Sequence, residues 1–490
     1  MSNPLALLPL AIAAGGGTLG AVGETAYEAR ALVAAGLTLL QRSATLVRAL
    51  SGRRAAILVP TSPQFLVALA ACDGRGAVLV NPLAAPAEVA FQCTDADVGA
   101  VFTVLALAAR VPAGMPMVLL DEAPRTARLV ASGEARDIDL GSHHGLALEG
   151  EAGVAGRDEE AAIVYTSAMR GRPLGAVLTH RNLLANARAT IEAIAPRADD
   201  HVLALLPFAH LFGLTVTLSA PLIMGARVST MDRFHPVRAA DLLGGDVSVV
   251  VGVPAVFHGM LTGLARRGAD LRGTALRLCI CGGAVLPEAL QDRWFAATGV
   301  ELRQGYGLTE AAPVCLYNRS DRLNVRGSLG VPFPGVDVEL RPLVQDRGAA
   351  TGAVAEGTEG EICVRGANVF PGYLHDGEAG LVRDDDWLRT GDAGVKLPGG
   401  SVRFTRLLKA MFTRNGFNVY PRELELAVEA MPGVLVASVS PVPDAVKEND
   451  IRLCVTGDVS EAAVRAWCAE RLSAYKQPSI IEITGPSHAE

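Results

Sequence analysis

Residues 161–179, which read AAIVYTSAMRGRPLGAVLT, decide the fold of this chain of 490 residues. The apolar run over 161–166 predicts a buried strand. Glycines and a proline then predict a loop, and a second apolar run over 176–178 predicts another short strand. Thr179 stands directly before a helical pattern, where an N-cap residue belongs, so a helix is expected to begin there. The sequence therefore predicts a strand, a loop, a strand and a helix in direct succession.

The same alternation extends on both sides of this stretch. Residues 55–59 and 77–80 have the pattern of short buried strands, and a helical pattern over 63–71 lies between them. Further apolar runs cover 247–253 and 276–281. Short apolar strands that alternate with helices are typical of an α/β protein whose strands are mainly parallel and buried.

The pattern changes toward the C-terminus. Over residues 336–372, short strands separated by glycine-rich turns predict a more antiparallel section. Farther on, a helix is expected to begin at Pro421, with strands over 434–442 and 451–455 and a second helix that carries Trp467. A small α+β domain of this length lies within the usual size range of domains.

The composition argues against some classes of function. Half of the residues are hydrophobic, only 5% are aromatic, and the formal net charge is -7. This charge gives no electrostatic basis for binding nucleic acid. The eight cysteines include no C-x-x-C spacing, and Cys279 and Cys281 are expected on one face of a strand. Reduced core thiols of a cytoplasmic protein are therefore favoured over a metal site.

Residues 202–226 are apolar over a length that could span a membrane. Pro207, Gly213 and Pro221 interrupt the segment, however, and such breaks would leave backbone groups without hydrogen bonds in lipid. We therefore expect a buried strand, loop and helix here and no transmembrane segment. Contact with a membrane surface stays open for a lipid substrate.

Five further motifs follow one another along the chain: LPFAHLFG over 206–213, GGA over 282–284, QGYGLTE over 304–310, WLRTGD over 387–392 and GFNVYP over 416–421. Each has a simpler explanation when taken alone. Paired glycines often form a turn, and a lone histidine is more often a hydrogen-bonded core residue. In this order, and together with the loop over 164–175, the motifs resemble the adenylate-forming superfamily. That superfamily includes acyl-CoA synthetases, luciferases and peptide-synthetase adenylation domains, and the resemblance covers nearly the whole chain.

The resemblance implies a fold and a division into domains. It implies an α/β protein whose large N-terminal adenylate-forming domain, residues 1–405, contains two parallel-rich sheet subdomains and a small antiparallel section. A small α+β C-terminal domain, residues 406–490, would follow it. The loop that contains Gly416 would turn toward the large domain and form a tunnel for the pantetheine arm of CoA or of a carrier protein.

The resemblance also implies a site for ATP and AMP. Tyr306 would stack on the adenine, and Asp392 would bind both ribose hydroxyls. The backbone that packs against the adenine would be that of Gly282, Gly283 and Ala284. An aromatic face beside a ribose-binding carboxylate is chemically suited to AMP.

The catalytic residues would be Thr309, Glu310 and His210. In the family, Thr309 would meet the α-phosphate and His210 would line the carboxylate site. Glu310 would help to hold Mg²⁺, which prefers hard oxygen ligands. The acid would attack the α-phosphorus, pyrophosphate would leave, and a thiol would then displace AMP from the acyl adenylate. Such an enzyme works by positioning its reactants and stabilising charge.

The phosphate loop departs from the family pattern. Its first glycine is replaced by Ala168, its two hydroxyl residues by Met169 and Arg170, and its lysine by Leu174. Four residues remain as candidate phosphate contacts: Thr166, Ser167, Arg170 and Gly171. Arg170 and Arg172 could grip a phosphate in place of the lost donors, or they could be solvated loop charges.

The hinge and the end of the chain depart from it as well. The hinge reads RLLKA over 406–410, so Lys409, a candidate cofactor contact, is kept while the usual aspartate is Ala410. After Pro478 the sequence contains no counterpart of the family's late catalytic lysine. Lys476 belongs to an earlier Tyr-Lys-x-Pro element and is not expected to replace it. Loss of a charge-stabilising cation typically lowers a rate by roughly 10²–10³.

These motifs predict an AMP-forming acid–thiol ligase with an impaired adenylation half-reaction. Its substrate would be a small-molecule carboxylic acid, fatty or aryl, because the segments that line the family's acyl pocket offer no partner for an ammonium group. The thiol would be CoA or the phosphopantetheine of an acyl carrier protein. Two alternatives stay open: an enzyme that takes a preformed acyl adenylate or thioester, and a non-catalytic acyl- or nucleotide-binding partner of a biosynthetic ligase. Oligomeric state is not predicted.

Overall fold

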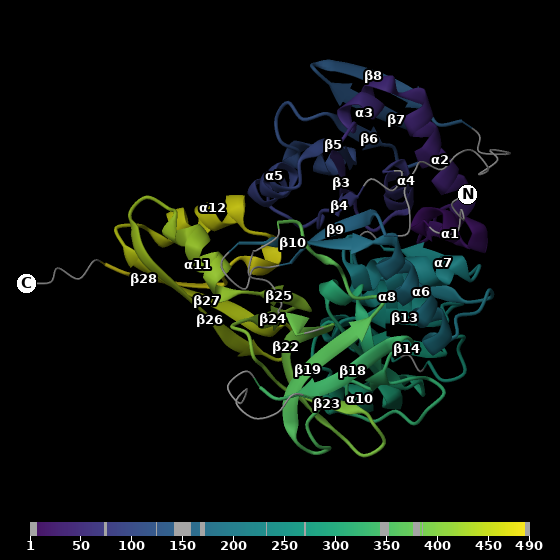
Figure 1. The fold of residues 1–490 in the computed structure, drawn as a ribbon, viewed down its shortest axis with the longest axis vertical. Helices are drawn as coiled ribbons and strands as arrows, with labels where there is room; N and C mark the ends of the chain where they lie inside the picture. The colour runs from purple at the N-terminus through teal and green to yellow at the C-terminus, as the bar shows by residue number, and fades with distance from the viewer. Residues whose placement is uncertain are drawn as a thin grey trace, which may run out of the picture.

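The computed structural model describes residues 7–72, 76–123, 125–141, 158–166, 172–231, 233–268, 271–343, 352–375, 383–384 and 386–485. A large N-terminal part is built on two nine-stranded sheets and one antiparallel sheet. A small C-terminal part, yellow in Figure 1, lies to one side of it. The mixed α/β fold expected from the sequence is confirmed.

The first nine-stranded sheet is parallel across its centre and antiparallel at both edges. In spatial order its strands are β17 (Val331–Pro332), β16 (Val314–Tyr317), β15 (Leu302–Gly307), β14 (Leu278–Cys281), β13 (Val249–Gly252), β11 (His201–Ala204), β12 (Arg227–Thr230), β1 (Thr18–Ala21) and β2 (Tyr27–Glu28). Central strands β11, β13 and β14 are buried along their whole length, which explains their continuous apolar sequences.

The second nine-stranded sheet has the same plan. Its strands in spatial order are β20 (Gly372–Tyr373), β10 (Leu174–Thr179), β9 (Glu160–Thr166), β4 (Ala77–Leu79), β3 (Arg54–Leu58), β5 (Val98–Thr103), β6 (Met117–Leu120), β7 (Thr126–Ala131) and β8 (Glu134–Asp139). The two strands predicted on either side of the phosphate loop are β9 and β10, and they pair antiparallel.

Helices cover the two sheets. They are α1 (Leu8–Gly15), α2 (Ala29–Arg42), α3 (Ala44–Ala49), α4 (Pro63–Ala71), α5 (Pro86–Asp95), α6 (His180–Ile194), α7 (Ala220–Ile223), α8 (Pro236–Leu243), α9 (Pro254–Arg267) and α10 (Glu288–Thr298). Thr179 caps α6 as predicted: its hydroxyl accepts from the backbone N–H of Asn182, and Asn182 accepts from the backbone N–H of Thr179. A strand, loop and π-helical turn (Gly213–Ser219) occupy the apolar segment that could have been mistaken for a membrane span.

The antiparallel section predicted near residue 336 is a separate sheet of β18 (Val336–Arg341), β19 (Glu359–Gly366), β22 (Trp387–Lys396), β21 (Arg383–Asp384) and β23 (Val402–Leu407). Strand β23 runs two residues past the predicted end of the large domain, because Arg406 and Leu407 pair with Ala393 and Asp392. The division between residues 405 and 406 stays a prediction.

The C-terminal part has a core of its own around Leu424, Val428, Leu453 and Val464. It contains a hairpin of β24 (Phe412–Arg414) and β25 (Phe417–Val419), a three-stranded sheet of β26 (Val434–Asp444), β27 (Glu448–Gly457) and β28 (Ile480–Thr484), and helices α11 (Pro421–Glu429) and α12 (Glu461–Arg471). Its helix α12 lies against α5 of the large part.

The described residues include no helix that is both long and apolar enough to cross a membrane. All eight cysteines are free thiols, and all but Cys454 are buried. Burial raises the pKa of Cys93 to about 11 and that of Cys279 to about 12, so these thiols are protonated and unreactive near neutral pH.

Candidate active site

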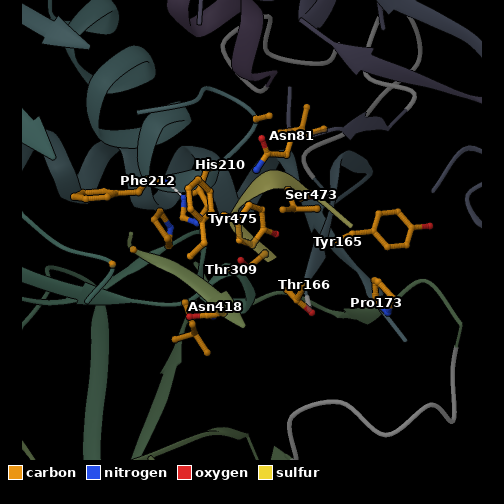
Figure 2. Close-up of a pocket in the computed structure, with 18 of the residues that line it drawn as sticks. Asn81, Tyr165, Thr166, Pro173, His210, Phe212, Thr309, Asn418, Ser473 and Tyr475 are labelled. Carbon is orange, nitrogen blue, oxygen red and sulfur yellow. Dashed lines mark hydrogen bonds between the residues drawn. The ribbon is translucent and has the colours of Figure 1, made fainter. Parts of the chain in front are cut away.

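A cavity of about 480 Å³ lies where the large and small parts of the chain meet. Side chains from both parts line it, including Thr166, His210 and Thr309 from the large part and Asn418 and Tyr475 from the small part. Figure 2 shows these labelled residues around one pocket. Tyr165, also on the wall, directs its hydroxyl to Asp95 at 2.6 Å instead.

The topology explains why these residues meet. His210 follows β11, Gly282 and Gly283 follow β14, and Tyr306 lies at the end of β15. These strands run parallel in one sheet, where β14 is next to β15 and only β13 separates it from β11, so the segments that leave their carboxyl ends converge at one edge. The cavity therefore occupies the usual ligand position of an open α/β sheet.

Tyr306 connects the cavity to a buried ion pair. Its hydroxyl donates to Asp392 Oδ2 at 2.7 Å, and Lys409 Nζ lies 3.4 Å from Asp392 Oδ1. The same ammonium donates to the carbonyl oxygen of Thr390 at 2.9 Å. Asp392 and Lys409 are not among the residues that line the cavity; they contact the wall through Tyr306. The structure thus brings together three residues predicted from separate motifs.

Thr309 and Glu310 lie in a short 3₁₀ turn (Thr309–Ala311) directly after β15. Thr309 lines the cavity, whereas Glu310 is buried beneath it and accepts a hydrogen bond from the Tyr373 hydroxyl at 2.8 Å. Burial raises the pKa of the Glu310 carboxyl, and the Tyr373 bond opposes that rise.

The surroundings of Glu310 allow a test of the expected Mg²⁺. Among the described residues, no group of three or more His, Cys, Asp or Glu could hold a metal by itself. Mg²⁺ on a nucleotide, however, is usually held by one or two carboxylates together with the phosphates. A single carboxylate next to Thr309 fits that mode and does not fit an all-protein metal cage.

His210 is half-buried in the wall in its neutral form. Its Nδ1 accepts from the backbone N–H of Phe212 at 3.3 Å, so the ring proton is assigned to Nε2. Burial lowers the pKa of His210 to about 4, which keeps the ring uncharged near pH 7. A neutral imidazole with a free Nε2–H direction can donate a hydrogen bond to a carboxylate or carbonyl oxygen.

The small part contributes an aromatic wall. The rings of Phe417 and Tyr475 are stacked at 4.4 Å between centroids, and Phe417 lies edge-on to His210 at 6.5 Å. Gly416, just before Phe417, has a φ of +76°, and a Cβ there would lie 2.4 Å from Val253 Cγ1. Only glycine allows the loop to pass this close to the large part.

One region of the cavity is apolar. Its lining comes from the end of α6, the π-helical turn and the residue before it, strands β14 and β16, and the residue after β17; these residues are Ile194, Phe212, Val216, Ile280, Tyr317 and Phe333. None of these six side chains carries a charge. The Phe212 ring lies against Gly282, where a Cβ would come within 3.1 Å of it.

The remaining predicted site residues divide into two groups. Thr166 lines the cavity, while Ser167, Arg170 and Gly171 lie outside the described residues. The carbonyl oxygen of Ala284 accepts from Gln304 Nε2 at 3.4 Å, next to the cavity rather than in its lining.

Several residues of the site have no role predicted from the sequence. Tyr373 holds Glu310, Phe417 and Tyr475 form the aromatic wall, and Glu88 reaches the cavity from α5. Phe417 and Tyr475 belong to quoted motifs, so their positions could have been found. Nothing in the sequence near Glu88 or Tyr373 connects either residue to the site.

A pocket at the carboxyl ends of parallel strands, with a second wall from a small C-terminal part, agrees with the fold of adenylate-forming enzymes. The chain belongs to the AMP-binding enzyme family, whose sequence model matches residues 40–374. Its relatives are AMP-forming acyl-CoA ligases, and this family uses ATP and CoA as substrates.

The chain is 32% identical to a feruloyl-CoA synthase from an Amycolatopsis species over 453 residues, which are 88% of this chain and 85% of the synthase. It is 33% identical to a long-chain-fatty-acid–CoA ligase from Yersinia pestis over 333 residues, 66% of this chain and 58% of the ligase. A solved malonyl-CoA ligase product complex with methylmalonyl-CoA and AMP bound is similar in structure, with a TM-score of 0.77, 27% identity and 96% of each chain covered.

Proposed function

We propose that this protein forms a thioester between an apolar carboxylic acid and the thiol of CoA or of a carrier-protein phosphopantetheine, through an acyl adenylate. The observation that carries the proposal is the composition of the cavity wall. Tyr306 and Thr309 from the nucleotide motifs face the same space as Gly416, Phe417 and Asn418 from the C-terminal loop. A single cavity can therefore hold an adenylate and receive a thiol.

The acid is proposed to be fatty or aryl. The apolar region around Phe212, Ile280 and Phe333 suits a hydrocarbon or aromatic body. Similarity to a feruloyl-CoA synthase and to a long-chain-fatty-acid–CoA ligase agrees with this class. An amino acid is disfavoured because the apolar region has no carboxylate for its ammonium group, and the two carboxylates elsewhere in the lining, Glu88 and Glu423, are bonded to Lys476.

In the second half-reaction, the thiolate attacks the acyl carbon and the bond from that carbon to the phosphate oxygen breaks, so AMP leaves. His210 Nε2–H is proposed to donate to the carbonyl oxygen, where negative charge develops in the transition state. The Thr309 hydroxyl is proposed to donate a hydrogen bond to the departing α-phosphate. Both side chains line the cavity, so neither role requires a rearrangement of the wall.

Mg²⁺ is proposed to be held by Glu310 together with the phosphates of the nucleotide. When bound, the ion would neutralise phosphate charge. The Tyr373 hydroxyl supports this role because it fixes the orientation of the carboxylate and opposes the rise of its pKa that burial causes.

We further propose that the adenylation half-reaction is the weaker of the two. Met169, Arg170 and Leu174 stand where the family loop has two hydroxyl residues and a lysine. Lys476 cannot replace a missing cation in its present position, because Nζ is held by Glu88 and Glu423 at 2.9 and 2.5 Å. This favours, as the second candidate function, an enzyme that takes an acyl adenylate made elsewhere.

Two assays on the wild-type protein test these proposals. The first supplies ATP, Mg²⁺, CoA and a panel of fatty and aryl acids. The second supplies the corresponding acyl adenylates with CoA or with carrier protein. We expect turnover in the second assay at least 10²-fold faster than in the first, because the loop has lost charge-stabilising donors. Equal rates would refute the weak adenylation, and no thioester in either assay would refute the ligase function itself.

Calorimetric titration with ATP and Mg²⁺ supplements these assays without knowledge of the acid. Micromolar affinity would show that the altered loop still holds a triphosphate. Affinity for AMP without affinity for ATP is the expected result for the second candidate function.

A further inference from the structure

A charged cluster lies at the edge of the cavity, between the large and small parts of the chain. Lys476 Nζ donates to Glu88 Oε1 at 2.9 Å and to Glu423 Oε1 at 2.5 Å. The Ser473 hydroxyl also donates to Glu88, at Oε2. All four residues line the cavity, and the Lys476 side chain is only 5% exposed.

The cluster joins elements that are far apart in the sequence. Glu88 lies in the first turn of α5, in the large part, where its carboxylate also accepts from the backbone N–H of Ala85. Glu423 lies in the first turn of α11, and Lys476 ends the 3₁₀ turn Ala474–Lys476, both in the small part. The ion pair of Lys476 with Glu88 is therefore a bond between the two parts.

The neighbours of Lys476 connect this bond to the catalytic cavity. Tyr475, the preceding residue, stacks on Phe417, and Phe417 lies edge-on to His210. Fixing Lys476 against α5 therefore fixes the aromatic wall against the imidazole. The connection from Lys476 to His210 therefore consists of one peptide bond and two ring contacts. All of its residues lie in the part of the chain that the structure describes.

The energetics suit a contact that forms and breaks. Removing two charges from water offsets most of the attraction between them, so a buried ion pair adds little net stability, yet loss of one partner leaves a costly unpaired charge. Two carboxylates share one ammonium here, and Glu423 Oε2 is buried with no hydrogen-bond partner. Burial raises the pKa of Glu423, consistent with this excess of acid.

We propose that Lys476 is a positioning residue for thioester formation, because its bond to Glu88 latches the small domain onto α5 and so holds Phe417, on which Tyr475 stacks, against His210. The role of the latch in catalysis rests on the proposed function, whereas the latch itself does not. Lys476 acts through its neighbours and does not touch the reacting atoms.

The test compares Lys476→Met, Glu88→Gln and the double variant with a matched control. Arg452→Met also removes one cation of the small domain, but its partner Glu482 lies in the same domain and both side chains are about half exposed. The first readout is amide hydrogen exchange. We expect faster exchange in α5 and in residues 416–418 for Lys476→Met and Glu88→Gln, and no change there for Arg452→Met.

The second readout is single-turnover thioester formation from a preformed acyl adenylate and CoA. Misplacement of a catalytic wall by about 1 Å can cost roughly 10²-fold, so we expect a 10- to 100-fold loss in each single variant. The double variant should lose no more of the thioester rate than either single variant, because both substitutions remove the same Lys476–Glu88 bond. Acyl-adenylate affinity should stay within threefold of the wild type.

Each outcome decides something separate. Unchanged exchange in α5 for Lys476→Met would overturn the latch, whatever the activity. Faster exchange with an unchanged thioester rate would overturn the positioning role and leave a structural contact. If the wild type makes no thioester, the proposed function fails, and exchange still decides whether the latch exists. If the losses of the two single variants add in the double variant, Lys476 and Glu88 do not act through one shared bond and the latch is overturned.

Discussion

The two walls of the cavity are built in different ways. The wall from the large part stands on strand ends: Tyr306 and the two glycines after β14 are held by backbone pairing in a nine-stranded sheet. The wall from the small part meets the large part through side chains, namely the edge-on contact of Phe417 with His210 and the bonds of Lys476 and Ser473 to Glu88. One wall cannot move without breaking a sheet, whereas the other can separate by breaking a few contacts.

Under the proposed function, the fixed wall would serve both half-reactions and the separable wall only thioester formation. A nucleotide needs a fixed frame in both half-reactions, and the sheet would provide it. A thiol must arrive and AMP must leave, so the opposite wall has to open and close between the steps. Changes in the fixed wall should therefore impair both half-reactions, and changes in the separable wall should impair only thioester formation.

The largest effect is expected from Asp392→Asn. The change removes the negative charge opposite Lys409 and weakens any bond to ribose hydroxyls, so affinity for AMP and for an acyl adenylate should fall by about 10²–10³-fold. Asp337→Asn is the control, since Asp337 forms an exposed pair with Arg365 in the antiparallel sheet. Titration calorimetry with AMP measures the effect. A melting curve checks that the variant stays folded, because the substitution leaves the buried Lys409 ammonium without its paired carboxylate. Unchanged AMP affinity would remove Asp392 from the site.

An intermediate effect is expected from Gly416→Ala, in the separable wall. The added Cβ would meet Val253 at 2.4 Å and would occupy a φ of +76°, so the loop must shift. Thioester formation from an acyl adenylate should fall by about 10–100-fold, with AMP affinity unchanged.

Gly399→Ala is the control that separates crowding from backbone strain. Gly399 also has a positive φ, of +87°, but a Cβ there would meet nothing within 4 Å. It should leave the thioester rate as in the wild type. The pair Gly416→Ala with Val253→Ala should regain part of the rate. A loss of AMP affinity in Gly416→Ala would contradict the division between the walls.

The smallest effect concerns His210 and pH. Burial lowers the pKa of His210 to about 4, whereas an unfolded histidine has a pKa near 6.5. Between these values the unfolded chain binds a proton that the folded chain does not, so stability falls as pH falls through this window. From pH 7 to 5.5 this amounts to about 1 kcal/mol. In His210→Asn, the side-chain oxygen can still accept from the backbone N–H of Phe212. Between pH 7 and 5.5 the free energy of unfolding of this variant, measured with urea, should fall by about 1 kcal/mol less than that of the wild type. An equal fall in both proteins would contradict a neutral ring at His210.

Much of the large part could be predicted from the sequence, because its signals are local. The strands on both sides of the phosphate loop, the cap at Thr179 and the parallel strands β3 and β14 all follow from apolar runs and turn residues. The antiparallel section and the helix at Pro421 were also predicted correctly. Strand ends shifted by one or two residues, as at β13, because hydrogen bonding to neighbouring strands rather than local composition decides where a strand stops.

Residues of the site could be predicted from the sequence only where they belong to one of the quoted motifs. Tyr306, Thr309, His210 and Gly416 line one cavity as the motifs implied. The bonds from Tyr306 to Asp392 and from Glu88 to Lys476 join segments 86 and 388 positions apart. No local pattern encodes such pairs, because they depend on how separately folded units pack. The roles assigned to all these residues stay predictions until the variants are measured.

Strand β20 has a consequence for how the phosphate loop and Glu310 influence each other. The strand pairs with β10, which leaves the loop directly, and its Tyr373 lies opposite Ala176 and donates to Glu310. One strand pairing and one hydrogen bond therefore connect β10 to the carboxylate of Glu310. A substitution in β10 that changes its pairing with β20 would change the position of the phenol that holds this carboxylate.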